Sequence, residues 1–187
     1  MPTSINPPWY CPASAGFFLS PVEHKDITMT EIITSITAAE LPAVGQPLAG
    51  GIFVGRYWAG KQARALVLLG AEHEFEGAWG EYGQDIAGTH WVDGETSTRA
   101  MAEAGSEIAK KALELGAFIP SCLEGQLIMA AKHAGAITDL REDRFYWLST
   151  QYSAYHAYYM DFEDGWQDHD GKRNERLVRP VRSLILQ

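Results

Sequence analysis

The chain has 187 residues, of which 46% are hydrophobic and 21% are charged, and its formal net charge at pH 7 is -9. This length suits one domain with an extension, and it is enough to bury a substantial core without a disulfide or metal staple. The negative charge argues against general binding to DNA or RNA, which needs a basic surface to contact phosphates. The densest candidates for a local basic patch are Lys172, Arg173, Arg176, Arg179 and Arg182.

The N-terminal stretch from Met1 to Ser20 is rich in Pro, Ser and Gly and has no helical or strand period. It is either a flexible leader or an arm that orders against a partner. Four aromatic residues favour the arm, because disordered tails are poor in aromatics; they are Trp9, Tyr10, Phe17 and Phe18. We expect residues 1–48 to form an N-terminal attachment segment and residues 49–187 to form the domain. No signal peptide or membrane span is indicated, so we expect a protein made in the cytoplasm.

The segment Gly50–Gly70 contains two apolar runs that flank the turn Ala59-Gly60-Lys61, which predicts a β-hairpin. Residues 72–91 are Gly-rich and predict a loop with irregular strand. The run Asp93–Thr98 marks a helix start with Thr or Ser as the N-cap. Apolar residues at spacings of three and four then predict one helix as far as Leu115.

A second helix is predicted after Pro120, because Ser121 lies three residues before Glu124 and the pair matches a capping box. Gly135 is expected to end it. Short strands follow near 145–150, 154–162 and 177–186, with loops or a short strand around 165–175. Helices and strands are segregated, which predicts an α+β fold with an antiparallel sheet. We expect the last strand, near Val181, to pair with the early hairpin.

Aromatic residues are concentrated near the C-terminus. Nine of the chain's 21 aromatic residues (6 Trp, 8 Tyr and 7 Phe) lie between Phe145 and Trp166. Many could fill a core, but Tyr155, His156 and Tyr159 cannot all point inward from one alternating strand. Exposed Tyr and Trp faces stack on sugars or anchor protein interfaces.

The C-terminal block resembles the domain family named after the C-terminal domain of the Lcl adhesin, and its closing Val-Arg-Pro-Val-Arg motif is fairly specific. Matches to the family pattern are Tyr146-Trp147-Leu148-Ser149-Thr150, Tyr152, Ala157-Tyr158, Phe162, Asp164-Gly165, Asn174 and Val178-Arg179-Pro180-Val181-Arg182. The helix start at Ile119-Pro120-Ser121 and the middle of the chain are also similar, the latter to copies encoded among phage and prophage tail genes. The resemblance covers roughly Gly50 to Arg182.

This resemblance implies a C-type-lectin-like domain with two helices packed on an irregular antiparallel sheet, plus an extended N-terminal segment. It places Trp147 and Phe162 in the core and implies an exposed ligand face between the scaffold strands. The expected ligand-binding residues are Tyr152, Tyr155, His156, Tyr159, Trp166, Asp168 and His169.

Metal and catalytic chemistry are not expected. The loop carboxylates Asp161, Asp164, Asp168 and Asp170 do not match an EF-hand, and the lectin signatures Glu-Pro-Asn and Trp-Asn-Asp are missing. The six histidines show no HExxH pattern, so zinc is not expected, and no phosphate-binding loop indicates a cofactor. The fold is also similar to that of formylglycine-generating enzymes, which use paired cysteines. This chain has only Cys11 and Cys122, which we expect to be unpaired thiols, with a disulfide as the alternative.

Two further predictions concern the thiol of Cys122 and the arginines near the C-terminus. Cys122 near a helix N-terminus could have a lowered pKa. One arginine of the Arg179-Pro180-Val181-Arg182 run is expected to be buried and paired with a carboxylate such as Asp161 or Glu163.

The sequence therefore predicts a non-enzymatic binding protein of a phage virion, associated with the tail or tail fibre. Its N-terminal segment would attach to other tail proteins, with a homotrimer as one option, and the aromatic face would bind a glycan or protein on the host surface. No nucleic acid and no membrane insertion are expected. The alternatives are a structural connector or assembly factor of the tail, a phage-encoded inhibitor of a host protein, or a glycan-processing enzyme with two carboxylates.

Overall fold

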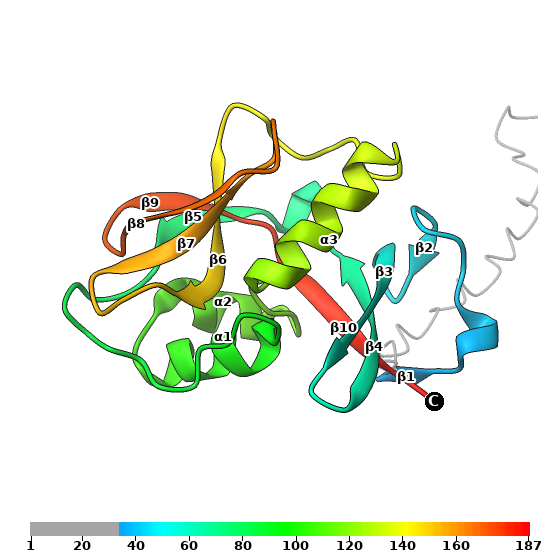
Figure 1. Ribbon diagram of the computed structural model, residues 1–187, viewed down its shortest axis with the longest axis horizontal. Coiled ribbons are helices and arrows are strands. Elements are labelled where there is room, and N and C mark those ends of the chain that lie inside the picture. Colours follow the sequence, from blue (N-terminus) through cyan, green and yellow to red (C-terminus); the bar gives the residue numbers. More distant parts are fainter. Residues whose placement is uncertain (1–33) are drawn as a thin grey trace, which may run out of the picture. The chain divides into compact units, whose positions relative to one another are not determined.

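Residues 34–187 are described in the computed structural model, and three α-helices and two five-stranded sheets make up this part of the chain (Figure 1). The α+β prediction is confirmed. Most of the predicted attachment segment, including Cys11 and its four aromatic residues, lies outside the described residues. Within residues 34–187, no helix is long and apolar enough to cross a membrane.

The first sheet has the strand order β1-β10-β4-β3-β2. Its strands are β1 (Ser35–Ile36), β2 (Pro47–Leu48), β3 (Gly51–Ala59), β4 (Gln62–Leu68) and β10 (Val181–Leu186). β3 and β4 form the predicted hairpin, and β10 pairs antiparallel with β4, as expected for the last strand. β1 runs parallel to β10, so this sheet is mixed. β1 and β2, which pair with β10 and β3, both lie N-terminal to the domain boundary expected after residue 48.

The second sheet has the order β5-β9-β6-β7-β8. Its strands are β5 (Phe75–Ala78), β6 (Phe145–Gln151), β7 (His156–Asp161), β8 (Gln167–Gly171) and β9 (Glu175–Val178). β6 runs parallel to β9, while the other neighbours are antiparallel. The single antiparallel sheet predicted from the sequence is therefore wrong. The predicted strand 177–186 divides at Arg179-Pro180 into β9 and β10, which belong to different sheets.

Three helices take the place of the two that were predicted. They are α1 (Gly94–Glu103), α2 (Glu107–Glu114) and α3 (Cys122–His133), and short 3-10 turns lie at Ala38–Glu40 and Ala71–His73. α1 and α2 separate at Gly105, whose φ of 100° is open to glycine but strained for other residues. The N-cap of α1 is Asp93, which accepts a 3.0 Å bond from Thr96 N, and not a Thr or Ser. The capping box of Ser121 and Glu124 is confirmed.

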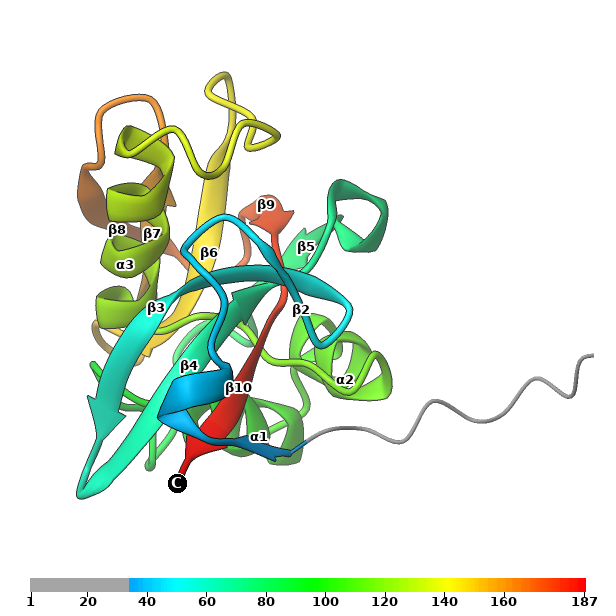
Figure 2. The same cartoon turned by 90° about the vertical axis from the view of Figure 1, so that its right-hand side faces the viewer.

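The core lies on both sides of the second sheet. α3 contacts β3 of the first sheet and β6 and β7 of the second, so it lies between the two sheets (Figures 1 and 2). α1 and α2 cover the other side of β6 and β5, where Trp147 packs with Trp79, Met101 and Ala109. Trp147 is 0% exposed and Phe162 is also buried, which confirms their predicted place in the core.

The Arg-Pro-Val-Arg run contains the buried arginine that the sequence predicted, but its partners differ. The Arg179 guanidinium donates to Glu74 at 3.1 Å and to Asp139 at 2.9 Å, and also to the carbonyl of Leu69. The expected partners Asp161 and Glu163 lie in and beyond β7, and Asp161 instead accepts from the backbone N–H of Glu163. Arg179 therefore anchors the junction between the two sheets.

Candidate binding surface

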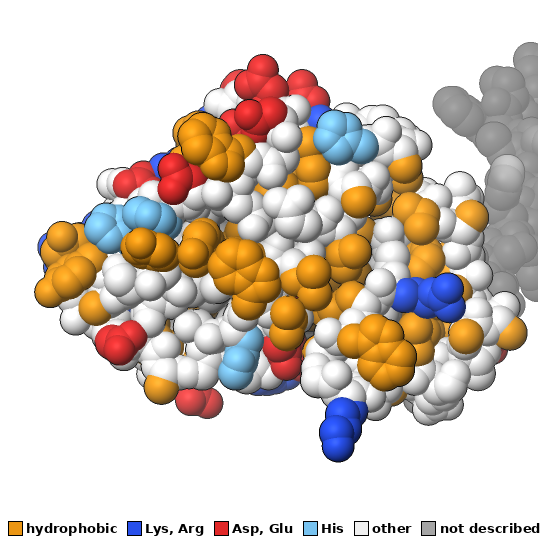
Figure 3. Space-filling view, viewed as in Figure 1, with side chains coloured by type: hydrophobic (Ala, Val, Ile, Leu, Met, Phe, Trp, Pro, Cys, Tyr) orange, Lys and Arg blue, Asp and Glu red, His pale blue; other side chains and the backbone are white. Residues whose placement is uncertain are grey.

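Five aromatic and histidine side chains meet on one side of the β7–β8 hairpin. We call them the aromatic face, and they are Trp91, Tyr152, His156, Tyr158 and His169. Register pairs Tyr158 with His169 and His156 with Gly171, and directly opposed residues of a pair point to the same side of a sheet. Figure 3 shows a band of hydrophobic and histidine side chains across the part of the surface where β7 and β8 lie in Figure 1.

Close ring contacts hold the aromatic face together. Tyr152 stacks on His169 with ring centroids 3.7 Å apart and planes 9° from parallel. Tyr158 meets Tyr152 edge to face at 5.6 Å and Trp91 at 5.1 Å, and His156 lies 5.3 Å from His169. The edge-to-face contacts of Tyr158 match the preferred geometry of aromatic rings, whereas Tyr152 and His169 form a closer, nearly parallel stack. Tyr152 is nevertheless 53% exposed, so its ring is fixed in place and remains open to solvent.

A tight turn places Tyr152 over the hairpin. The backbone N–H groups of Tyr152 and Ser153 both donate to His156 O, at 3.1 and 3.0 Å. In return, Ser153 Oγ accepts from the N–H groups of Tyr155 and His156. The turn between β6 and β7 is therefore satisfied by its own polar groups, and it directs the Tyr152 ring back onto His169.

A buried lysine lies next to this turn. Lys172 Nζ donates to Gln84 O and Gln151 Oε1, both at 2.6 Å, and lies 4.6 Å from the centre of the Trp79 ring. Burial lowers the pKa of Lys172 to about 8. Gly83 N also donates to Ala154 O, so the loop before Trp91 is tied to the turn between β6 and β7.

The same loop contributes a second aromatic pair at the β6–β7 end of the hairpin. Tyr82 lies 4.9 Å from Tyr155, and both are exposed. Gly83 has a φ of 88°, a conformation that other residues rarely adopt. At the opposite end of the hairpin, Trp166 precedes β8 and is 65% exposed.

The structure brings together only some of the residues predicted from the sequence. Tyr152, His156 and His169 share the aromatic face, while Tyr155 and Trp166 lie at the two ends of the hairpin. Tyr159 and Asp168 are directly opposed in the register, so both point to the other side of the sheet and neither belongs to the aromatic face. There the Arg176 guanidinium lies 4.2 Å from the Tyr159 ring and 4.9 Å from Phe145, and it pairs with Asp170. Tyr159 is therefore half-buried against Arg176 and the partly exposed Phe145.

Three residues of this surface are not among the seven predicted ligand-binding residues: Tyr82, Trp91 and Tyr158. Trp91 and Tyr82 come from the Gly-rich segment 72–91, for which the sequence predicts a loop with irregular strand and no binding residue. Tyr158 was placed in a strand, but its neighbours depend on the β7–β8 register. Because the sequence predicts either loops or a short strand around residues 165–175, it could not show that Tyr158 faces His169.

The loop carboxylates do not converge on one point. Asp161 accepts from Glu163 N at 2.8 Å, Asp164 from Trp166 N at 2.9 Å, and Asp168 from His169 N at 2.8 Å. Each of the three carboxylates therefore accepts from a backbone N–H one or two residues further along the chain. Within residues 34–187, no group of three or more His, Cys, Asp and Glu side chains is arranged to hold a metal ion.

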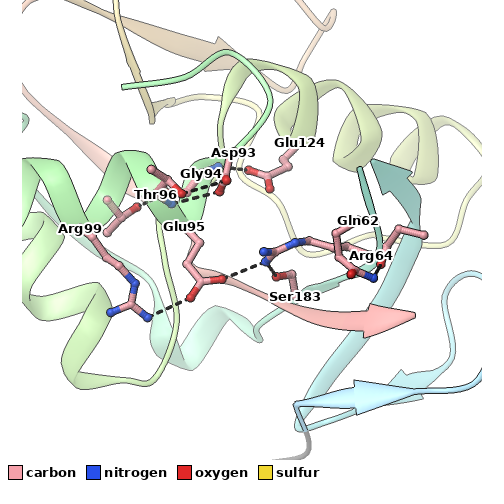
Figure 4. Close-up of polar contacts among 11 residues, drawn as sticks. Gln62, Arg64, Asp93, Gly94, Glu95, Thr96, Arg99, Glu124 and Ser183 are labelled. Atoms are coloured by element: carbon pink, nitrogen blue, oxygen red, sulfur yellow. Dashed lines mark hydrogen bonds and ion pairs between the residues drawn. The ribbon is translucent and has the colours of Figure 1, made fainter. Parts of the chain in front are cut away.

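A second polar cluster joins α1 and α3 to the first sheet (Figure 4). Glu95 pairs with Arg64 at 3.0 Å and Arg99 at 2.8 Å. Glu124 Oε2 accepts from Gly94 N at 3.1 Å and Ser121 N at 2.7 Å, and burial raises the pKa of Glu124 to about 7. Because Glu124 is 0% exposed, this carboxyl cannot reach a substrate and we assign it a structural role.

Two other features bear on catalysis. The lowered pKa expected for Cys122 is wrong: burial raises the pKa of this thiol to about 12, because desolvation outweighs the hydrogen bond with Thr150. A pocket with a volume of about 540 Å³ lies between β5 and α2, with Phe75, Ile108 and Lys111 among its lining residues. None of the seven predicted ligand-binding residues lines it.

The described part of the chain is therefore an α+β protein with an exposed aromatic face on one hairpin. No protein-family model matches the sequence, and no curated protein matches it either.

Proposed function

We propose that this chain is a non-enzymatic binding protein that recognises a glycan through the aromatic face. The observation that carries this proposal is the Tyr152–His169 stack, in which a flat ring is held rigidly and left 53% exposed. A rigid aromatic anchor loses little conformational entropy when it binds. The exposed side of such a ring can pack against the apolar face of a pyranose.

Polar groups around the stack suit the hydroxyls of a sugar. The Tyr152 hydroxyl donates or accepts, and the His156 imidazole offers one ring nitrogen as a donor and the other as an acceptor. Exposed aromatic side chains also lie at both ends of the hairpin, with Tyr82 and Tyr155 at one end and Trp166 at the other. Exposed rings of this kind favour a segment of a polysaccharide over a small molecule enclosed in a cavity.

The sequence resemblance supports a more specific setting for this activity. We infer a C-type-lectin-like domain carried on a phage tail, attached by its N-terminal segment to other tail proteins and presenting the aromatic face to a host-surface glycan. The three-helix, two-sheet arrangement supports an α+β domain of this kind, and the resemblance alone carries the lectin-like and tail assignments.

A second candidate function is a structural connector whose aromatic face is covered by another chain. The exposure of Tyr82, Trp91, Tyr152, Tyr155 and Trp166 on one hairpin and its supporting loop favours it, because clustered exposed apolar side chains are typical of protein interfaces.

Oligosaccharide arrays followed by calorimetry on the best ligand test the proposal. Tyr152→Ala should weaken binding by about 2 kcal/mol or more, as truncation of an anchor aromatic does. Trp58→Ala is the control, since Trp58 is a 64% exposed tryptophan on β3 of the other sheet. Absence of binding to every oligosaccharide, together with a stable oligomer in sedimentation that Tyr152→Ala dissociates, would support the connector instead.

A further inference from the structure

We propose that the pocket between β5 and α2 binds a small ligand that carries a carboxylate on an apolar body, and that Lys111 is the cation that selects it. None of the residues of the aromatic face lines this pocket. The inference therefore goes beyond the proposed function and does not depend on it.

The pocket lies at the edge of the second sheet, and its walls are fixed in place. β5 is the outermost strand of that sheet, and all four of its residues line the pocket together with the start of α2. α2 approaches β5 closely because Gly77 has no side chain: a Cβ at this position would lie 2.6 Å from Ile108 Cγ2. Ser106 Oγ also donates to Trp79 O at 2.6 Å, which fastens the start of α2 to the end of β5. The volume of about 540 Å³ lies within the range of roughly 300–1,000 Å³ that is usual for small-molecule sites.

The two walls both contribute apolar lining. Phe75 comes from β5 and Ile108 from α2, and their side chains are 7% and 4% exposed. Both belong to the core cluster that also contains Trp79 and Trp147, so their positions are set by packing. A ligand with an apolar body can cover the carbon atoms that they leave exposed, at little cost in side-chain ordering.

The carboxylates that line the pocket are already matched by cations. There are three of them, and the pairs are Glu76 with Arg144, Glu81 with Arg173, and Glu107 with Lys110. Arg173, which also lines the pocket, is therefore engaged. Among residues 34–187, Lys111 is the lining cation that has no carboxylate partner.

Lys111 stands directly over the apolar wall. Its Nζ lies 4.5 Å from the centre of the Phe75 ring. Glu107, one turn earlier on α2, is spaced to pair with Lys111 but instead pairs with Lys110 at 2.7 Å. The net charge of -9 belongs to the whole chain, and charges more than about 8 Å away are largely screened at physiological ionic strength. A ligand in the pocket would thus meet one unmatched positive charge beside an aromatic ring.

A carboxylate on an apolar body fits both features of the pocket. An ion pair with an exposed lysine changes affinity by a factor of about 1.5 to 5, and salt weakens it. A neutral amide of the same shape would keep the apolar contact and lose the charge interaction. An amine of the same shape would be repelled by Lys111.

NMR titration of the full chain with three indole probes tests the inference. The probes are indole-3-acetate, indole-3-acetamide and tryptamine, which carry a negative charge, no charge and a positive charge. We expect shifts in the backbone amide signals of three glycines that line the pocket, Gly77, Gly80 and Gly105. The acetate should bind about 1.5 to 5 times more tightly than the acetamide, high salt should reduce this ratio, and tryptamine should bind most weakly.

One variant and a matched control assign the preference. Lys111→Gln removes the charge at an exposed position, so it should abolish the preference for the acetate and leave the affinity for the acetamide nearly unchanged. Lys61→Gln, an exposed lysine in the turn between β3 and β4, should change neither. The inference is overturned if no probe shifts the three glycines, if tryptamine binds as tightly as the acetate, or if Lys111→Gln keeps the full preference. Shifts confined to Tyr152 and His169 would overturn it too, and would leave the proposed function of the aromatic face intact.

Discussion

The buried carboxyl of Glu124 should make the stability of this protein fall as the pH rises. Glu124 accepts two backbone bonds at the starts of α1 and α3, but its Oε1 has no hydrogen-bond partner and the side chain is fully buried. Burial raises its pKa from 4.5 to about 7, although the bond from Ser121 N acts in the opposite direction. The folded state therefore binds this proton more tightly than the unfolded state.

The direction and size of the effect follow from linkage. A raised pKa contributes stability that is fully present below the unfolded pKa and is lost as the pH rises through the folded pKa. For Glu124 the window runs from about pH 4.5 to about pH 7. A shift of this size corresponds to about 3 kcal/mol of unfolding free energy, at 1.36 kcal/mol per pKa unit.

Urea unfolding of Glu124→Gln and the parent protein across this pH window measures the effect. The amide cannot ionise, so the variant should lose about 3 kcal/mol less stability than the parent between pH 4.5 and pH 8. Its baseline stability should be lower, because the amide N–H₂ takes the place of an oxygen that has no partner. Glu103→Gln, an exposed change on α1, is the control. Parallel stability curves for the parent and Glu124→Gln would refute the reasoning.

Four other outcomes are expected. Trp147→Ala should lower the unfolding free energy by about 3–5 kcal/mol in urea titrations, because it empties a fully buried site, whereas Tyr155→Ala should change it little. Tyr159→Ala should destabilise the fold measurably without weakening glycan binding, because Tyr159 packs on Arg176 away from the aromatic face; weaker binding at unchanged stability would contradict this. Arg179→Ala should cost about 3–5 kcal/mol, since it leaves Glu74 and Asp139 without their buried partner; a change below about 1 kcal/mol would show that water replaces the guanidinium. EDTA should shift the melting temperature by no more than about one degree, as expected without a bound metal; a calcium-dependent rise would contradict it.

The sequence predicted those elements that depend on residues close together in the chain. The hairpin of β3 and β4 follows from Gly60 and two apolar runs, and the capping box of α3 follows from Ser121 and Glu124. The break between α1 and α2 is also local, but the apolar spacing continues across Gly105 and conceals it. The two sheets were not predictable in this way. The strand near Val181 switches sheets at Pro180, where Arg179 is held by Glu74 and Asp139, which are distant in the sequence.

The composition of the aromatic face depends on register, which no local pattern determines. Tyr158 and Tyr159 are adjacent and chemically alike, yet β7 points them to opposite sides of the sheet. Tyr158 lies opposite His169 and joins Tyr152, while Tyr159 lies opposite Trp147 on β6 and joins the Arg176 cluster. A shift of β8 by one residue would put Asp168 in the place of His169 on the aromatic face and remove the stack on Tyr152. The buried Lys172 connects Gln151, the last residue of β6, with Gln84, and thereby joins the strand that precedes Tyr152 to a loop far away in the sequence.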